Sequence, residues 1–192
     1  MKRLLAVLTV CLLGSMLVGP AYAAADEGDC AATIQLFKDA GESATFFGKS
    51  YGYAVFPTIG KAGLGIGGAH GSGCVYAGGK RVGKSKMTQL SFGWQAGAQG
   101  YSMIIFFEDE RAFTEFTSGN FEFGAQASAV AITAGASAGA GTGGSGAGAS
   151  GGKKDAATSG GYSKGVAPFV IIKGGLMYEA AVAGAKFSYD KL

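Results

Sequence analysis

Glycine or alanine occupies every second position over long parts of this chain, and that spacing limits the possible folds more than any other feature. From residue 63 to residue 73 every odd position is glycine or alanine, whereas the even positions include Leu64, Ile66 and His70. A period of two belongs to extended chain, so this segment predicts a β-strand with one face almost bare of side chains. A bare face lets a neighbouring backbone, an aromatic ring or a second sheet approach closely.

The same alternation returns further along the chain. In residues 90–101 the large side chains Leu90, Phe92 and Trp94 fall on one side, and in residues 121–133 two phenylalanines are followed by alternating alanines. The continuous apolar run at 103–107 predicts a strand buried on both faces. Residues 166–190 again predict strand, with Lys173-Gly174-Gly175 as a turn or bulge.

Helical spacing is confined to two places. Residues 30–49 predict one or two short helices, before a strand at 53–56 that Pro57 is expected to end. Residues 108–120 predict a helix, because acids lead, Phe113 and Phe116 are three apart and Gly119 closes the segment. The low-complexity segment 135–161 predicts a flexible loop.

Together these elements predict a mainly β protein of the α+β class. We expect a Gly/Ala-rich antiparallel sheet closed as a barrel or a sandwich, with an N-terminal helical flank and one inserted helix.

Residues 1–23 predict a signal peptide. Two cations precede an apolar stretch from Leu4 to Val18, and the small residues Ala21 and Ala23 precede the first acids. We expect cleavage near Ala23, export to the periplasm or envelope, and one domain over residues 24–192. An uncleaved anchor is the alternative.

Net charge argues against one class of function, nucleic-acid binding, and the cysteines allow one disulfide. The signal segment holds Lys2 and Arg3 and no acid, so its removal lowers the net charge from +3 to +1. A nearly neutral chain is not built to bind nucleic acid, which requires a concentrated positive face. Cys30 and Cys74 form a possible disulfide in an exported protein; the alternative is two small buried apolar side chains.

Three motifs resemble catalytic or cofactor sites. Gly63-x-Gly65-x-x-Gly68 has the spacing of a dinucleotide turn, but no helix pattern follows and the next acid is Glu108. Two G-x-S-x-G matches, at 135–139 and 148–152, lie in low-complexity sequence, and the single histidine precedes both. We therefore expect no catalytic residues, no cofactor and no enzyme activity, although a site assembled from distant residues is an alternative.

His70 is the single histidine of the chain. We interpret it as a hydrogen-bonding residue near a strand end. A weak metal site shared with Cys74, four residues on, is the alternative, and we expect no metal.

One basic cluster suggests a binding role. Lys80, Arg81, Lys84 and Lys86 lie close together among glycines, so we expect a hairpin tip or loop whose cations meet anionic lipid headgroups or phosphate. A merely solvated loop is the alternative.

Three stretches in this order resemble the SYLF domain family: GYAVFPTIGKAGLGIGGAHGSGCVYAGG at 52–79, SFGWQAGAQGYSMIIFFEDERAFTEFTSGNFEFGAQASAVA at 91–131, and KGGLMYEAAVAGAKFS at 173–188. The similarity covers nearly all of residues 30–192. It implies lipid binding: eukaryotic members are associated with phosphoinositide membranes and, in fungi, with actin, whereas bacterial members are commonly exported.

From these observations we expect an exported, non-enzymatic protein that binds anionic lipid at an envelope membrane. The basic cluster would attract the headgroup, and the candidates for an interfacial apolar contact are Phe46, Phe47, Tyr51 and Tyr53. A periplasmic structural or protein-interaction module without a lipid ligand is the alternative. Actin is not an expected partner of an exported chain.

Overall fold

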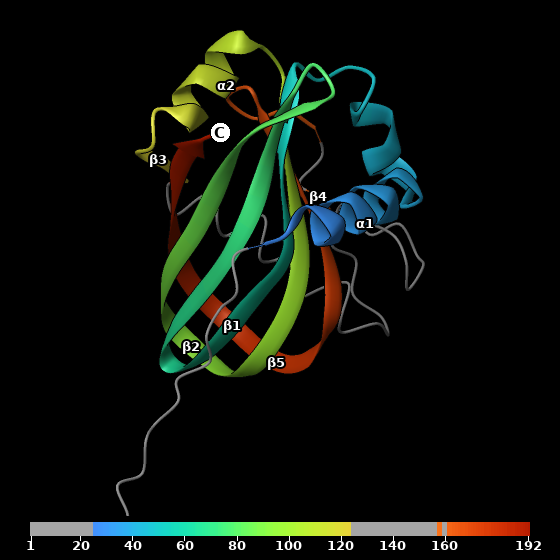
Figure 1. The fold of residues 1–192 in the computed structure, drawn as a ribbon. Helices are drawn as coiled ribbons and strands as arrows, with labels where there is room; N and C mark the ends of the chain where they lie inside the picture. The colour runs from blue at the N-terminus through green and yellow to red at the C-terminus, as the bar shows by residue number, and fades with distance from the viewer. Residues whose placement is uncertain (1–24, 124–156, 159–160) are drawn as a thin grey trace, which may run out of the picture.

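The computed structural model describes residues 25–123, 157–158 and 161–192 (Figure 1). The predicted signal segment and most of the predicted 135–161 loop, with both G-x-S-x-G matches, lie outside these residues. Helix α1 (Glu27–Lys38) and the 3₁₀ helix η1 (Gly41–Phe46) precede a first pair of long strands, β1 (Gly52–Ala77) and β2 (Lys80–Phe107). Helix α2 (Glu110–Thr117) and the short strands β3 (Phe121–Phe123) and β4 (Ala157–Thr158) lead to a third long strand, β5 (Val166–Lys191).

One antiparallel sheet contains all five strands of the described residues. Its order is β1-β2-β5-β3, and β4 also pairs with β5. The long strand β2 is central, because it pairs with β1 along one edge and with β5 along the other over nearly its whole length.

The three long strands curve round together, so that the sheet folds over on itself (Figure 1). We call the two halves the first limb and the second limb. The first limb contains residues 52–60 of β1, 100–107 of β2 and 166–172 of β5. The second limb contains residues 70–77, 80–88 and 186–191 of the same strands, and the bend lies between the two limbs. The ring of Phe56 in the first limb lies 5.6 Å from the ring of Phe187 in the second.

Small residues let the two limbs of β1 meet. A Cβ atom on Gly73 would collide with the carbonyl oxygen of Val55 and would lie 2.7 Å from a ring carbon of Phe56. A Cβ on Gly71 would lie 2.6 Å from the side chain of Ile59. The bare strand face predicted from the glycine spacing is therefore the surface on which the strand crosses itself.

We expect Gly73→Ala to lower the free energy of unfolding by about 1–3 kcal/mol, the usual cost of overpacking a close contact. Urea denaturation followed by circular dichroism measures this change. Gly184→Ala is the matched control, because a Cβ on Gly184 meets nothing within 4 Å. Equal midpoints for the two variants would show that the limbs are not closely packed at Gly73.

Two apolar clusters hold the fold together. The first lies between the limbs and contains Phe56, Met87, Met103 and Phe187, with Ala112 and Phe116 of α2 packed into it. The second lies between the outer surface of the first limb and the N-terminal helices, where Phe37 packs with sheet residues such as Ile104, Phe106 and Phe169. The outer surface of the first limb is thus covered by α1 and η1.

Both α-helices begin at a capping aspartate. The carboxylate of Asp26 accepts a hydrogen bond from the amide of Asp29 at 2.8 Å, and that of Asp109 accepts one from the amide of Ala112 at 2.8 Å. These contacts satisfy donors that the first helical turn would otherwise leave without a partner. Helix α2 has the amphipathic pattern predicted from its phenylalanines, with Phe116 buried.

The predicted fold class is confirmed in its main features: the sheet is antiparallel, a helical segment precedes it, one helix is inserted, and residues 103–107 are buried. Closure as a barrel is wrong. The sheet order has two ends, and within the described ranges no ladder joins β1 to β3. The limbs of β1 approach each other through glycines rather than through hydrogen-bonded pairs, so the sheet folds over without closing.

Pro57 does not end the first strand as expected. β1 continues to Ala77, and its register with β2 shifts between Phe56 and Ile59. Proline lacks an amide hydrogen and is tolerated at such a bulge. The carbonyl of Pro57 accepts a 2.7 Å hydrogen bond from the buried hydroxyl of Ser102. The 173–175 segment is a bulge as predicted, because the β2–β5 register shifts there, opposite Gly100 and Tyr101.

Candidate functional site

Large apolar side chains are exposed at the bend of the sheet. Five lie on β1 and β2: Leu64 (84% exposed), Ile66 (65%), Leu90 (58%), Phe92 (58%) and Trp94 (89%). We call these five residues the apolar tip. An exposed apolar cluster of this kind marks a surface that meets a partner or a membrane.

Strand register brings these residues to one face. Leu90, Phe92 and Trp94 alternate along β2, and Ile66 is the direct partner of Phe92 across the β1–β2 ladder. Side chains at directly paired positions share a face of the sheet, so the tip is continuous across both strands. Gly65, with a φ of +71°, occupies the register shift between Leu64 and Ile66, where a residue with a side chain would be strained.

The opposite face of the bend is polar. Gln89, Ser91 and Gln95 are almost fully buried there. The amide oxygen of Gln95 accepts a 2.8 Å hydrogen bond from the Ser91 hydroxyl, and its amide nitrogen donates to the carbonyls of Ser91 at 3.0 Å and Gly65 at 3.2 Å. At this end of the sheet, polar groups therefore face inward and apolar groups face outward, the reverse of the usual arrangement in water.

Cations continue the same outer face toward the second limb. Lys84 and Lys86 are exposed and alternate with buried residues on β2, in line with Leu90, Phe92 and Trp94. Asp190 is the β5 partner of Lys84. Lys186, whose β2 partner is Thr88, forms an ion pair with Glu122 at 3.2 Å. One face thus carries lysines at one end and the apolar tip at the other.

The four residues of the predicted basic cluster lie in different surroundings in the structure. They do not form one loop: β1 and β2 are joined by a tight turn at Gly78 and Gly79, and the cluster lies within β2. Lys80 is exposed beside this turn. The side chain of Arg81 is only 14% exposed and pairs with Glu27 of α1 at 3.6 Å, so it connects the helix to the sheet.

The predicted interfacial aromatics mostly belong to the second apolar cluster. Phe46 packs on Phe106 and Phe169, and Phe47 on Phe106, with ring centroids 4.8–5.5 Å apart. Tyr53 stacks on Tyr76 at 5.1 Å, and burial raises the pKa of both phenols. Tyr51 is 44% exposed, next to Phe113. Phe46 and Phe47 therefore cover the first limb, to which Tyr53 itself belongs, and most of the exposed large apolar side chains among the described residues lie at the bend instead.

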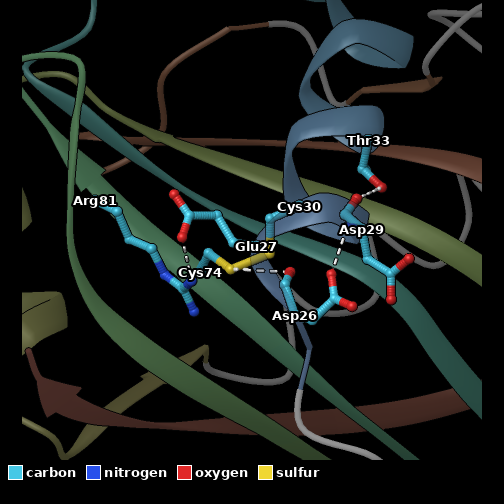
Figure 2. The surroundings of a disulfide bond; sticks show 7 residues. All are labelled: Asp26, Glu27, Asp29, Cys30, Thr33, Cys74 and Arg81. Atoms are coloured by element: carbon cyan, nitrogen blue, oxygen red, sulfur yellow. Dashed lines mark hydrogen bonds and ion pairs between the residues drawn. A yellow bond between two sulfur atoms is a disulfide. The ribbon is translucent and has the colours of Figure 1, made fainter.

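Cys30 of α1 and Cys74 of β1 are joined by a disulfide with an S–S distance of 2.07 Å (Figure 2). The figure also shows Arg81 reaching Glu27 beside the bridge. The bond crosses from the second limb to the helix that covers the first limb. It attaches α1 to β1 at a fully buried position, since both cysteines are 0% exposed.

The other motifs do not form a catalytic or metal centre in the described part of the chain. Residues 63–73, with the dinucleotide-like spacing, belong to continuous strand β1. His70 lies opposite Thr88 in the ladder, with 3.3 Å between its Nδ1 and the threonine hydroxyl oxygen. Cys74 is held in the disulfide, and the described residues contain no group of three or more metal-binding side chains. No helix among them is long and apolar enough to cross a membrane.

Sequence reasoning missed the apolar tip as a site. The alternation of Leu90, Phe92 and Trp94 was visible, but period two shows only that they share a face and not which face meets solvent. The sequence did hold one signal, the polar residues Gln89, Ser91 and Gln95 at the intervening positions. A strand buried on both faces rarely carries so many polar side chains on one of them, so one face of this segment had to be solvent-exposed.

Fold and surface define an α+β protein with one folded-over antiparallel sheet, helices over the outer surface of its first limb and exposed apolar side chains at its bend. A family model described as "Las17-binding protein actin regulator" (Ysc84) matches residues 88–191. The chain therefore belongs to the Ysc84, or SYLF, family.

The chain is also similar to a curated protein. "Beta cell expansion factor A" of Aeromonas veronii is 29% identical over 163 residues, which cover 83% of this chain and 54% of the relative. The chain thus spans about half the length of that protein. No solved structure matches.

Proposed function

We propose that this protein binds the surface of an anionic membrane through the apolar tip and the lysines beside it. The observation that carries the proposal is the reversed polarity at the bend, where Phe92 and Trp94 face solvent while Ser91 and Gln95 are buried. Membership of a family linked to lipid or actin binding supports it.

The apolar tip has the chemistry of an interfacial anchor. Tryptophan is favoured at the boundary between headgroups and acyl chains, and leucine, isoleucine and phenylalanine gain free energy by leaving water for the outer acyl region. All five tip residues lie on one face of two paired strands. They can therefore enter the interface together without unfolding the sheet.

Lys84 and Lys86 place positive charge at one end of the same face. When the tip enters the membrane, lysines further along the face lie near the headgroup level, where each cation contributes about 1 kcal/mol on an anionic surface. Lys80 is further along the same direction. Arg81 takes no part, because it is mostly buried and paired with Glu27.

Replacing both Lys84 and Lys86 with glutamine is expected to weaken binding to anionic vesicles about tenfold or more at low salt, because two headgroup attractions of about 1 kcal/mol are removed. Co-sedimentation with phosphatidylglycerol-containing and with purely zwitterionic vesicles, across a salt series, measures this effect. The wild-type protein should lose affinity as salt rises, and the variant should respond less.

Lys49→Gln with Lys164→Gln is the matched control, because both lysines are exposed and the net charge changes equally. It should bind as the wild type does. Equal weakening by the two double variants would show that only net charge matters. Wild-type protein that binds neither kind of vesicle would contradict the proposal and favour a protein-interaction module.

We further propose that the protein acts as a binding protein without catalysis, and that it acts outside the cytoplasm. The N-terminal pattern of residues 1–23 and the Cys30–Cys74 bond both suit an oxidising compartment. N-terminal sequencing of the protein from an envelope fraction tests the export, with Ala24 expected as the first residue. The expected partner is lipid rather than actin, because a protein exported to the periplasm or envelope is separated from cytoplasmic actin.

A further inference from the structure

The side chain of Gln95 connects the two strands that carry the apolar tip. Its amide oxygen accepts a hydrogen bond from the Ser91 hydroxyl at 2.8 Å, and its amide nitrogen donates to the carbonyl oxygens of Ser91 at 3.0 Å and Gly65 at 3.2 Å. Gln95 is 4% exposed, so these bonds are shielded from water behind the outer face of the tip. Hydrogen bonds that water does not reach hold their groups in one arrangement.

Gln95 lies where the backbone ladder between β1 and β2 is interrupted. The register shifts between Leu64 and Ile66, so that one residue of β1, Gly65, lies opposite residues 93–95 of β2. Regular backbone pairing cannot continue across one residue on one strand and three on the other. The hydrogen bond from the Gln95 amide to the Gly65 carbonyl crosses this gap. A side chain therefore joins the two strands at the point where the ladder is interrupted.

Glycines of β1 make the room for this side chain. A Cβ atom on Gly63 would lie 3.0 Å from the Cδ atom of Gln95. A Cβ atom on Gly67 would lie 2.8 Å from the same Cδ atom and would collide with the amide oxygen. The bare face of residues 63–67 is therefore the surface on which the Gln95 amide lies. The glycine alternation serves the tip at the bend, as well as the contact between the limbs further along β1.

We propose that Gln95 is the positioning residue of the apolar tip. Its bonds to Ser91 enclose the β2 segment with Phe92 and Trp94, and its bond across the gap holds the facing β1 segment to it. The tip side chains are thereby ordered before they meet a membrane, and an ordered surface loses less entropy on binding. The inference rests on the proposed membrane role for its effect on binding, whereas the ordering of Trp94 can be measured in the free protein.

Gln95→Leu removes all three hydrogen bonds and keeps a side chain of similar size. The chain contains one tryptophan, Trp94, so tryptophan fluorescence reports on the tip directly. We expect the fluorescence anisotropy of Trp94 in the free variant to fall, because the indole moves more on the nanosecond timescale. Affinity for phosphatidylglycerol-containing vesicles at low salt should fall about tenfold, since the tip must then be ordered on binding.

Gln89→Leu is the matched control. Gln89 lies on the same inner face of β2 and is 3% exposed, but its amide nitrogen has no hydrogen-bond partner to lose. The control should keep the anisotropy of Trp94 and bind vesicles within about twofold of the wild type. If Gln95→Leu does not fold, Ser91→Ala removes the bond to the amide oxygen alone and should weaken vesicle binding about two- to threefold, with a smaller fall in anisotropy.

The two readouts separate positioning from a merely structural role. Lower anisotropy together with weaker vesicle binding in Gln95→Leu, and neither in Gln89→Leu, supports the proposal. A folded Gln95→Leu variant with a lower urea midpoint, but with the anisotropy and vesicle affinity of the control, overturns it. Lower anisotropy with wild-type affinity also overturns it, because the tip then binds without being ordered. If the wild type binds no vesicle, the proposed membrane role fails, and lower anisotropy in Gln95→Leu still assigns the positioning of Trp94 to Gln95.

Discussion

Replacing Phe92 and Trp94 together with serine is expected to lower affinity for anionic vesicles by about a hundredfold or more. Burial of a large apolar side chain contributes about 1.5–3 kcal/mol, so loss of two removes at least about 3 kcal/mol of membrane binding. Vesicle co-sedimentation at fixed low salt measures the change. Because both side chains are more than half exposed, the free energy of unfolding should change by about 0.5 kcal/mol or less.

The matched control is Leu36→Ser with Tyr51→Ser. These residues are also exposed and apolar, at 37% and 44%, but they lie on α1 and before β1, away from the bend. The control should bind vesicles as the wild type does. A tip variant that binds within about threefold of the wild type would show that the membrane, if it is bound at all, contacts another surface.

Removing the disulfide by Cys30→Ala with Cys74→Ala is expected to lower the free energy of unfolding by about 4 kcal/mol. The bond closes a loop with a sequence separation of 44, and a crosslink over such a loop strongly restricts the unfolded chain. Urea denaturation measures the difference. The local destabilisation should be greatest at α1. The bond attaches this helix to the sheet beside Tyr76 and Val55 in the second apolar cluster.

Reduction of the wild-type protein provides the control for this prediction. Dithiothreitol should move the wild-type midpoint to that of the double variant and leave the variant unchanged. If the oxidised wild type and the variant unfold at the same urea concentration, the bond does not stabilise the fold, and α1 is held by Phe37 and its neighbours alone.

Much of the secondary structure could be predicted because local patterns determine it. The alternation around Gly67 required extended chain, the run at 103–107 required burial on both faces, and the acids before Phe113 required a helix start. Each of these depends only on neighbouring residues. The family resemblance could likewise be read from residues 52–79, 91–131 and 173–188.

Other features depend on contacts between distant residues. Alternation alone does not show that Gly73 meets Val55 of the same strand rather than a separate sheet, so the sequence does not distinguish a folded-over sheet from a barrel or a sandwich. The role of Arg81 depends on Glu27, more than fifty residues earlier, and removes it from the expected basic cluster. The exposed face of Trp94 likewise depends on which side the bend turns.

The order of the strands also bears on when the fold can form during synthesis. The last strand, β5, completes the central ladder, and Phe187 near its end contacts Phe56, Phe116 and Phe123. The interior between the limbs therefore lacks one of its walls until Phe187 has been made. The paired strands β1 and β2 therefore expose this apolar interior during synthesis, and stable folding waits until β5 has been made.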